Sequence, residues 1–540
     1  MITTMMDQAL TISSVMKFAD KIYPCQEIIS VTADQPCHRY TYADAFKRTR
    51  KLANALQALG LVQGDVIATM AWNDHRHFEL YYAISCSGMV CHTINPRLFD
   101  EQIEYLVEHA EDKWLFVDPL FVPKLEKLQD KMPHLQGFVI LTSEDNMPDT
   151  SLRNTQCYET LIQKFDDKFE WPEFDENTAS ALCYTSGTTG NPKGVVYSHR
   201  STVLHSYASS LPDAFGLSRQ DVVMPIVPMF HVNGWGIVYS APMAGAKLVM
   251  PGPRMADGET LTRLINEEQI TMSAGVPTVW LALLQYLGDS NESIDSLKRI
   301  TVGGASCPLS IFKIFKEKHD VDVEHAWGMT EMSPLGTYNK MTQKDFELPE
   351  EAFTEALLRQ GRPIFGVDLR IVDEEGQELP WDGKSSGAVQ VRGPFITQSY
   401  HKLDGDFSQD GWFATGDVAY LDPESRMQIT DRTKDIIKSG GEWISSIELE
   451  NLAMNHPDVA EAAVIGISHI KWTERPLLVV VKKAESVIGT EDILSFFSGK
   501  VATWWVPAAC ELVKELPHTA TGKLDKKVIR EQFKDYIWTD

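Results

Sequence analysis

The sequence predicts an α/β protein of at least two domains, and three observations support this prediction. The chain has 540 residues, which is more than one hydrophobic core usually supports. Apolar strand-like runs alternate with helical patterns over residues 40–118 and 180–304, as is typical of parallel sheets covered by helices. Beyond Gly361 the pattern changes to short alternating strands and then to an α+β segment of about a hundred residues.

The first α/β region lies between residues 40 and 118. Residues 40–60 carry apolar side chains at helical spacing and end at Gly60, a residue type that is common just after a helix. Short apolar runs follow, and each is separated from the next by a helical pattern. We expect strands at residues 65–71, 89–94 and 114–118 and helices at residues 75–88 and 100–109.

A second α/β region begins near residue 180 and shows the same alternation. A short apolar run leads into a Thr/Gly-rich loop, and a brief strand and a helix follow that loop. We expect strands at residues 180–184, 195–196, 222–226, 247–250 and 299–304 and helices at residues 199–211 and 261–269.

Strands of a different kind follow Gly361. Residues 367–372, 387–392 and 418–422 alternate between apolar and polar side chains, which predicts a small antiparallel, barrel-like unit. A charged stretch at Asp431–Lys434 then precedes a helix at 446–456, strands at 461–467 and 477–482, a helix at 491–500 and a basic C-terminal helix. We place the domain boundary at this stretch and predict domains of residues 1–432 and 433–540.

Composition limits the possible partners and the compartment. A net charge of -25 argues against nucleic acid and anionic membranes as partners. The eight cysteines are scattered without a C-x-x-C pair, which predicts buried thiols in a reducing compartment. We see no secretion signal and no apolar run long enough to span a bilayer, so we expect a cytoplasmic protein without integral membrane association.

The Thr/Gly-rich loop at residues 184–198, YTSGTTGNPKGVVYS, is the most informative stretch of the chain. Glycines allow close approach of the backbone to a ligand, hydroxyl and amide groups donate hydrogen bonds, and a lysine supplies a cation. This combination predicts a polyphosphate site, although the Walker A spacing is absent. The alternative is a Ser/Gly-rich surface loop. The candidate phosphate-binding residues are Thr185, Ser186, Gly187, Thr188, Thr189, Gly190 and Lys193.

Three further segments carry suitable chemistry. Residues 327–331, WGMTE, combine an aromatic face for a purine, a hydroxyl for a phosphate and a carboxylate for Mg²⁺. Residues 413–417, FATGD, end a turn with a carboxylate that can accept bonds from ribose hydroxyls, and residues 519–523, TATGK, place a lysine on a loop. The alternatives are a core tryptophan for Trp327, a helix-end carboxylate for Glu331, a turn residue for Asp417 and a solvated lysine for Lys523.

The order of these motifs resembles the ANL superfamily of adenylate-forming enzymes over nearly the whole chain. The resemblance is carried by YTSGTTGNPKG, HVNGWG, VGGASCP, WGMTE, ATGD, DRTKDIIKSGGEWIS and TATGK. HVNGWG, HAWGMTEMSP and KWTERP look like medium-chain fatty-acyl-CoA ligases and the 3-methylmercaptopropionate-CoA ligases of dimethylsulfoniopropionate degradation. The resemblance implies the ANL fold, with a large N-terminal domain, a barrel-like subdomain and a mobile C-terminal domain.

The resemblance also implies ATP, Mg²⁺ and CoA as cofactor and co-substrates, and a role for each matching residue. Thr330 would contact the α-phosphate, Glu331 would bind Mg²⁺, and Lys523 would stabilise charge in the transition state. With His231, these are the implied catalytic residues. Asp417 would hold the ribose. The implied ATP- and AMP-binding residues are Thr185, Ser186, Gly187, Thr188, Thr189, Gly190, Lys193, Gly303, Gly304, Ala305, His325, Ala326, Trp327, Gly328, Met329, Thr330, Asp417 and Arg432.

A moving C-terminal domain would serve the two half-reactions in turn, as the resemblance implies. Lys434 matches the hinge position and Asp435 is adjacent to it. Gly440 and Gly441 would let the backbone line a narrow tunnel for pantetheine, and the alternative is a Gly-Gly hairpin turn. The implied tunnel residues are Lys438, Ser439, Gly440, Gly441, Glu442 and Trp443.

The acyl pocket is expected around the HVNGWG motif. The implied acyl-substrate residues are His231, Trp235, Gly236, Val302 and Gly303. No aspartate stands here to pair an amine, and a large indole would limit depth, so we expect a C4–C10 fatty acid or 3-methylmercaptopropionate. Two alternatives stay open: an adenylating enzyme that loads a separate acyl carrier protein, and a non-catalytic member of the superfamily. A homodimer is left open as the assembly.

Overall fold

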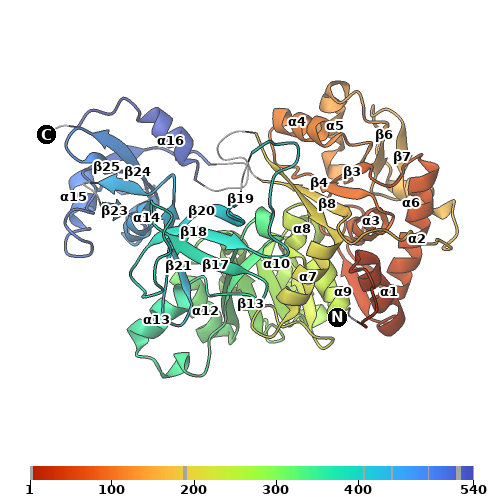
Figure 1. Ribbon diagram of the computed structural model, residues 1–540, viewed down its shortest axis with the longest axis horizontal. Helices are drawn as coiled ribbons and strands as arrows, with labels where there is room; N and C mark the ends of the chain where they lie inside the picture. The colour runs from red at the N-terminus through yellow and green to blue at the C-terminus, as the bar shows by residue number, and fades with distance from the viewer. Residues whose placement is uncertain are drawn as a thin grey trace. The chain divides into compact units, whose positions relative to one another are not determined.

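The computed structural model describes residues 4–185, 191–405, 408–439, 442–484, 486–518 and 524–538 (Figure 1). The chain divides into two compact units. The first unit comprises residues 1–185, 192–368 and 392–407. The second unit comprises residues 186–191, 369–391 and 408–540.

A seven-stranded sheet in the first unit has the order β7-β6-β5-β3-β4-β8-β9. All neighbours in it are parallel except β8 and β9, which form an antiparallel pair. The strands are β3 (Val66–Met70), β4 (Val90–Thr93), β5 (Trp114–Val117), β6 (Gly137–Ile140), β7 (Thr155–Cys157), β8 (Ala179–Tyr184) and β9 (Gly194–Ser198).

A nine-stranded sheet in the same unit has the order β16-β15-β14-β13-β12-β10-β11-β1-β2. Its centre is parallel and its two ends are antiparallel. The strands are β1 (Glu27–Ser30), β2 (His38–Thr41), β10 (Val222–Pro225), β11 (Lys247–Met250), β12 (Met272–Gly275), β13 (Arg299–Val302), β14 (Asp322–Gly328), β15 (Leu335–Asn339) and β16 (Arg362–Pro363).

Helices pack on these two sheets, and α2 and α3 lie together beside the seven-stranded sheet (Figure 1). Helix α2 begins at a capping box in which Thr41 and Asp44 satisfy each other's backbone N–H groups. The helices of the first unit are α1 (Ile12–Ile22), α2 (Tyr42–Ala58), α3 (His75–Cys86), α4 (Asp100–Ala110), α5 (Val122–Leu128), α6 (Tyr158–Gln163), α7 (His199–Ser210), α8 (Val232–Trp235), α9 (Ile237–Ala244), α10 (Gly258–Glu268), α11 (Pro277–Ser290), α12 (Leu309–His319) and α13 (Glu350–Leu358).

The second unit contains two smaller sheets. An antiparallel sheet joins β17 (Asp368–Val372), β18 (Gly387–Arg392), β20 (Trp412–Leu421) and β19 (Ser408–Gln409), and β21 (Met427–Arg432) pairs with β20. The other sheet joins β23 (Glu442–Ile444), β22 (Ile437–Ser439), β25 (Thr473–Lys482) and β24 (Val459–His469), and β26 (Ala509–Val513) pairs with β25. The helices of this unit are α14 (Ser446–Met454), α15 (Thr490–Ser495) and α16 (Lys526–Gln532).

Most predicted elements are confirmed to within a few residues. The strand at Lys247–Met250 and the strand at Gly387–Arg392 have the predicted bounds, and Gly60 follows α2 with a φ of +82°. One placement was wrong: the segment Phe413–Asp417 does not end a turn but lies inside the ten-residue strand β20. The pairing of β20 with β18 shifts register here and Gly416 has a φ of +77°, but Asp417 pairs with Arg432 of β21, so the strand continues through this irregular point.

Two further expectations need correction or refinement. All eight cysteines are free thiols, but Cys25 and Cys37 are exposed, so the prediction that all are buried was wrong. The predicted barrel-like unit is a sheet with the strand order β17-β18-β20-β19, and β21 also pairs with β20.

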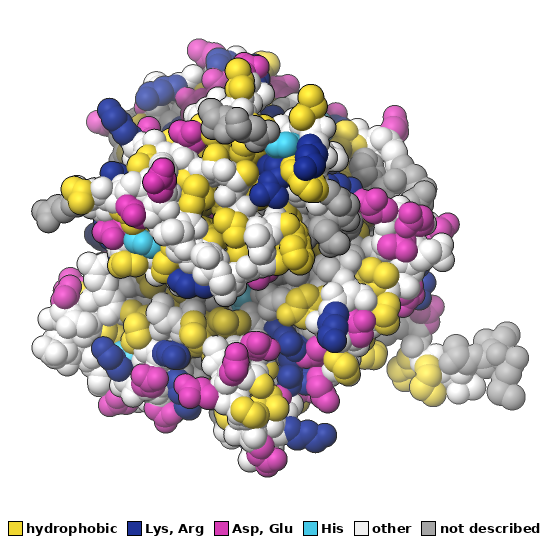
Figure 2. Space-filling view, turned by 90° about the vertical axis from the view of Figure 1, so that its left-hand side faces the viewer, with side chains coloured by type: hydrophobic (Ala, Val, Ile, Leu, Met, Phe, Trp, Pro, Cys, Tyr) yellow, Lys and Arg dark blue, Asp and Glu magenta, His cyan; other side chains and the backbone are white. Residues whose placement is uncertain are grey.

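Acidic and basic side chains are interspersed over the face of the molecule that Figure 2 displays, with hydrophobic side chains between them. A helix able to cross a membrane is not found in the part of the chain that the structure describes.

Candidate active site

The predicted phosphate loop is the connection between β8 and β9. Tyr184 and Gly194 are paired across these antiparallel strands. Thr185 N–H donates to the Lys193 carbonyl at 2.9 Å, and Lys193 N–H donates to Thr185 Oγ1 at 3.2 Å. The ends of the loop are therefore held together by the sheet. Ser186, Gly187, Thr188, Thr189 and Gly190 lie outside the described residues.

Buried polar side chains support the start of this loop. The Tyr184 hydroxyl lies 2.7 Å from His109 Nδ1, and the ring of Tyr184 lies 5.1 Å from that of His92. His92 Nδ1 is 2.8 Å from Asp112 Oδ2, and both side chains are fully buried. Burial raises the pKa of Tyr184 and lowers the pKa of His109, so the phenol donates and the imidazole accepts. Sequence reasoning did not identify this cluster, because its members come from three separate elements and a connecting loop.

Thr330 and Glu331 lie on a short 3-10 turn (Thr330–Met332) that follows β14, and both are buried. The Tyr197 hydroxyl, from β9, donates to the Thr330 carbonyl at 2.5 Å. Thr397 N–H donates to the Glu331 carbonyl at 2.8 Å. The structure thus brings the two predicted residues beside the strand that leaves the phosphate loop.

Tyr400 is a site residue that the sequence did not reveal. Its hydroxyl donates to Glu331 Oε1 at 2.7 Å, and Lys193 Nζ lies 4.8 Å from its ring centroid. Burial and the Glu331 carboxylate raise the pKa of Tyr400, so the phenol keeps its proton. Because Tyr400 lies more than 60 residues beyond Glu331 in an irregular segment, spacing along the chain could not connect them.

The donor set around Glu331 fits a magnesium ion that is shared with a nucleotide. Mg²⁺ is usually bound by one or two carboxylates together with substrate phosphates. Glu331 supplies one buried carboxylate, and no group of three or more His, Cys, Asp or Glu side chains that could hold a metal occurs among the described residues. The residues present therefore fit a metal that enters with ATP and do not fit a cage made of protein ligands alone.

Trp327 is a buried residue at the end of β14. Only 7% of its surface is exposed, and a Cβ at Gly336 would lie 2.7 Å from its Cζ3 atom. The close packing of its ring on Gly336 agrees with the alternative interpretation, a core tryptophan. Stacking of a purine on the ring remains a prediction. Ala326, Gly328 and Met329 flank it along the chain.

His325 and the glycines after β13 lie next to each other in the nine-stranded sheet. His325 pairs with Val302, and its Nδ1 lies 3.1 Å from the Leu358 carbonyl. Burial lowers the pKa of His325, so the ring is neutral near pH 7. Gly304 has a φ of +80°, which lets the chain turn away from β13 before Ala305.

The predicted acyl-binding motif folds as a left-handed turn. Residues 232–236 have φ values of 48°, 52°, 57°, 58° and 75° in succession, and three of them, Val232, Asn233 and Trp235, are not glycine. This conformation costs about 1–2 kcal/mol for each L-residue and is rare in succession. Strain of this kind concentrates at functional sites. His231 precedes the turn, and its N–H donates to the Pro228 carbonyl at 3.0 Å.

Neighbouring groups hold the turn in place. Asn233 Oδ1 accepts from Cys183 Sγ at 3.3 Å, and burial raises the pKa of that thiol to about 11. A Cβ at Gly236 would lie 2.9 Å from Nδ1 of His205, so only glycine fits there. The turn presents the Trp235 indole to Gly303, where a Cβ would lie 2.8 Å from its Cη2 atom. Val302 is fully buried and belongs to the same hydrophobic core cluster as Phe230.

In the second unit, Asp417 and Arg432 face each other across β20 and β21. Arg432 Nε lies 2.8 Å from Asp417 Oδ1. The Asp417 side chain is 3% exposed and that of Arg432 is 45% exposed. Asp417 N–H donates to Thr415 Oγ1 at 3.1 Å. A carboxylate is an acceptor of the kind that ribose hydroxyls need.

The predicted hinge lies in a tight turn after β21. Asp435 N–H donates to the Arg432 carbonyl at 2.9 Å. Arg530, from α16, forms an ion pair with Asp435 and donates to the Lys434 carbonyl at 3.2 Å. Burial lowers the pKa of Lys434.

The predicted tunnel residues begin on β22. Lys438 forms an ion pair with Glu374 at 2.5 Å, and Ser439 is buried. Gly440 and Gly441, and the side chains of Glu442 and Trp443, lie outside the described residues. Lys523 also lies outside them, and the described residues on either side, His518 and Leu524, are paired as an isolated bridge.

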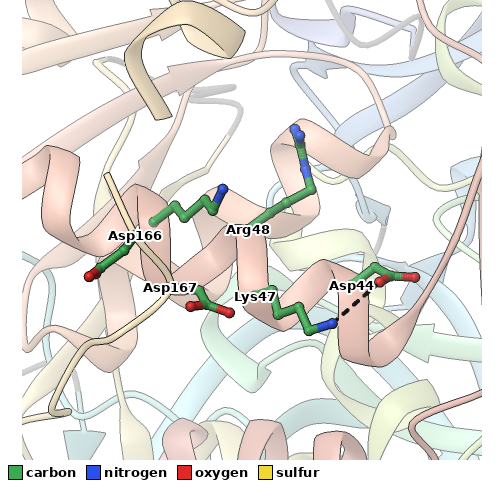
Figure 3. A pocket seen from close by; sticks show the side chains of 6 residues that line it. Asp44, Lys47, Arg48, Asp166 and Asp167 are labelled. Carbon is green, nitrogen blue, oxygen red and sulfur yellow. Dashed lines mark ion pairs between the residues drawn. The ribbon is translucent and has the colours of Figure 1, made fainter. Parts of the chain in front are cut away.

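A surface hollow of about 450 Å³ is lined by none of the predicted site residues (Figure 3). It lies on the polar face of α2, where Lys47 Nζ is 4.0 Å from Asp44 Oδ1. Arg48 is engaged by Glu79 and Glu159. Three carboxylates balance its three cations, so its charge favours no anionic or cationic ligand. Its lining residues are Asp44, Lys47, Arg48, Lys51, Asp166 and Asp167.

Comparison with known proteins adds to this geometry. The AMP-binding enzyme family matches residues 19–401, and the AMP-binding enzyme C-terminal domain matches residues 448–523. The chain is 50% identical to 3-methylmercaptopropionyl-CoA ligase of Ruegeria lacuscaerulensis, over 99% of this chain and 100% of that protein. It is 46% identical to medium-chain-fatty-acid–CoA ligase of Ectopseudomonas oleovorans, over 99% and 98%. Its fold matches ATP-bound MatB from Rhodopseudomonas palustris with a TM-score of 0.82 at 25% identity, over 98% and 99%.

Proposed function

The chain belongs to the AMP-binding enzyme family and is an acyl-CoA ligase, and from this premise we propose that its acid is 3-methylmercaptopropionate or a C4–C10 fatty acid. Its co-substrates are ATP with Mg²⁺ and CoA. We also propose which residues bind each substrate and how the two domains divide the reaction between them.

The reaction proceeds in two displacements. A carboxylate oxygen of the acid forms a bond to the α-phosphorus of ATP, and the bond from that phosphorus to the bridging oxygen breaks, so that pyrophosphate leaves. The thiolate of CoA then bonds to the acyl carbon, and AMP leaves from the acyl-adenylate. Catalysis of the first displacement depends chiefly on positioning and on neutralising charge.

In the proposal, the described residues of the first unit bind the nucleotide as follows. Thr185 and Lys193 hold the ends of the loop that binds the β- and γ-phosphates. Thr330 contacts the α-phosphate, and Glu331 would hold Mg²⁺, which would neutralise negative charge on the phosphates. Trp327 lies beside the adenine, with His325 and residues 303–305 around it.

The second unit supplies the remaining roles. Asp417 and Arg432 hold the ribose, and Lys523 stabilises the negative charge that develops between carboxylate and α-phosphate. Residues 433–540 turn about Lys434 and Asp435, so that Lys523 serves the first displacement and the loop from Lys438 to Trp443 lines the CoA tunnel in the second.

The size of the acid rests on one observation, the packing of Trp235 against Gly303. The indole is 7% exposed and lies in the left-handed turn of residues 232–236. A fixed indole beside the acyl residues limits the depth that an acid can occupy. The acids in the names of the two relatives at 50% and 46% identity also support a short or medium chain.

A CoA-ligation panel tests the acid. Purified protein is given ATP, Mg²⁺, CoA and one of butyrate, hexanoate, octanoate, dodecanoate or 3-methylmercaptopropionate (also called 3-methylthiopropionate). The acyl-CoA product is detected by mass spectrometry. We expect kcat/KM to be highest for 3-methylthiopropionate or for one of the three shorter fatty acids, and lowest for dodecanoate. A maximum at dodecanoate would contradict the proposal.

We also propose a cytoplasmic location, on the basis of eight free cysteines. We propose that the protein assembles as a homodimer. Analytical ultracentrifugation at micromolar protein concentration tests this proposal.

A further inference from the structure

Tyr400 connects the two charged residues that the proposed function assigns to ATP and Mg²⁺. Its phenol hydroxyl donates to Glu331 Oε1 at 2.7 Å, and its ring centroid lies 4.8 Å from Lys193 Nζ. A cation above a tyrosine ring is attracted by the negative face of the ring. One neutral side chain therefore contacts the cation of the phosphate loop and the carboxylate of the metal site.

The backbone on either side of Tyr400 is fixed to the same two parts of the site. Thr397 N–H donates to the Glu331 carbonyl at 2.8 Å, and His401 N–H donates to the Gly194 carbonyl at 2.7 Å. A Cβ at Gly194 would lie 3.1 Å from the Cβ of His401, so a side chain there would crowd this approach. Residues 397–401 thus span from the Glu331 turn to the first residue of β9, next to Lys193.

The chemistry of the phenol suits this position. Its O–H donates a hydrogen bond to Glu331 Oε1, and its ring meets the Lys193 ammonium. A hydrogen bond from a neutral phenol to a buried carboxylate orients that carboxylate without neutralising its charge.

We propose that Tyr400 is a positioning residue for the nucleotide half-reaction. Its hydroxyl orients the Glu331 carboxylate for Mg²⁺, and its ring holds the Lys193 ammonium in place before ATP binds. The two parts of the side chain have separate tasks. The inference rests on the proposed roles of Glu331 and Lys193 and adds the residue that couples them.

Equilibrium binding of ATP separates these tasks. The dissociation constant of ATP is measured by calorimetry with excess Mg²⁺ and again with EDTA, for wild type, Tyr400→Phe and Tyr400→Leu. Tyr400→Phe keeps the ring and loses the hydroxyl, so we expect about tenfold weaker binding of Mg·ATP and unchanged binding of metal-free ATP. Tyr400→Leu loses both, so we expect binding of metal-free ATP to weaken as well.

Two controls complete the experiment. Tyr207→Phe removes a hydroxyl from an exposed tyrosine on α7 and should leave both dissociation constants unchanged. Glu331→Gln tests the proposed function itself, because it should abolish the gain in affinity that Mg²⁺ brings. The ratio of the two dissociation constants does not depend on the fraction of folded protein, so it remains valid for a less stable variant.

The outcomes separate the two claims. If Glu331→Gln removes the Mg²⁺ effect and Tyr400→Phe does not reduce it, the positioning role is wrong and the metal role of Glu331 stands. If Glu331→Gln leaves the Mg²⁺ effect intact, the metal role fails, and the inference fails with it. A reduced Mg²⁺ effect in both variants, with normal metal-free binding in Tyr400→Phe, supports the inference.

Discussion

Trp235 packs against Gly303 so closely that a Cβ at Gly303 would lie 2.8 Å from Cη2 of the indole. The two residues come from different parts of the first unit, since Trp235 lies in the left-handed turn and Gly303 follows β13. A Cβ at that distance would force the indole to move. Gly303 therefore makes room for the indole, and we expect a substitution of either residue to change which acids the enzyme accepts.

Replacing the indole should extend the range of acids. In Trp235→Leu the space beside Gly303 opens, so we expect kcat/KM for dodecanoate relative to hexanoate to rise at least tenfold, since one methylene-sized difference is worth about 1–3 kcal/mol. The acid panel described above measures it. Leu281→Ala, on the exposed side of α11, is the control and should leave the ratio unchanged. An unchanged ratio in Trp235→Leu would show that the indole does not limit depth.

The Asp417 carboxylate should distinguish nucleotides by their ribose hydroxyls. Asp417→Asn keeps the shape of the side chain but weakens its acceptor strength, so we expect about tenfold weaker binding of ATP. Because Arg432 is 45% exposed, the lost ion pair should cost at most about 1 kcal/mol of stability. Competition between ATP and its 2′- and 3′-deoxy analogues measures the effect. We expect Asp417→Asn to bind ATP and one of the two deoxy analogues with nearly equal affinity. If the variant keeps the wild-type preference for ATP over both analogues, the ribose role is refuted.

The hydrogen bond between Tyr184 and His109 should act on ATP affinity through the phosphate loop. Tyr184→Phe and His109→Leu each remove the 2.7 Å contact that holds the residue before the loop. We expect KM for ATP to rise several-fold with kcat nearly unchanged, because the loop itself keeps its chemistry. Steady-state kinetics with saturating acid and CoA checks this, with Tyr207→Phe as the matched tyrosine control. Loss of kcat without a change in KM would contradict the prediction.

Lys523 and Gly440 should affect different half-reactions. Lys523→Ala removes a charge needed in the first displacement, so we expect adenylation to fall about a hundred- to thousandfold while thiolysis of supplied acyl-adenylate persists. Gly440→Leu should do the reverse, because a side chain would obstruct the tunnel. ATP–pyrophosphate exchange and thioester formation from synthetic acyl-adenylate measure the two steps separately. Equal loss of both activities in Lys523→Ala would refute the two-orientation scheme.

The stability of the first unit should fall in mild acid, partly because of His205. Its Nε2 accepts from the Leu335 N–H at 3.1 Å, and burial lowers the pKa of His205 from 6.5 to about 3. The unfolded chain binds a proton near pH 6.5 that the folded protein does not, so this stability is complete above that pH and is lost as the pH falls toward 3. At pH 5.5, one unit below the unfolded pKa, the loss is about 1.4 kcal/mol.

Melting curves at pH 7.5 and 5.5 test the contribution of His205. His205→Gln keeps an acceptor for Leu335 but does not titrate, so the drop in melting temperature between the two pH values should be smaller by about 1–3 °C. His319→Gln changes a partly exposed histidine at the end of α12 and should keep most of the wild-type drop. An equal drop in wild type and His205→Gln would contradict the assignment.

Local patterns in the sequence determined most of the elements and the candidate motifs. Helix α2 and strands β11 and β18 follow from apolar spacing and turn residues, because these properties depend on neighbours a few positions away. The Thr/Gly composition around residue 187 and the carboxylate of Glu331 were recognisable for the same reason. The family also followed from the order of these motifs.

Only the tertiary structure decided which distant residues meet. Tyr400 touches Glu331 and Lys193, and His109 supports Tyr184, because segments far apart in the chain fold side by side. The left-handed turn at 232–236 is equally hidden, since no local preference favours it for valine or tryptophan. Long-range contacts reach this turn: the indole packs on Gly303, and the Cys183 thiol donates to Asn233 Oδ1. Such long-range contacts leave no periodic signal in a single sequence.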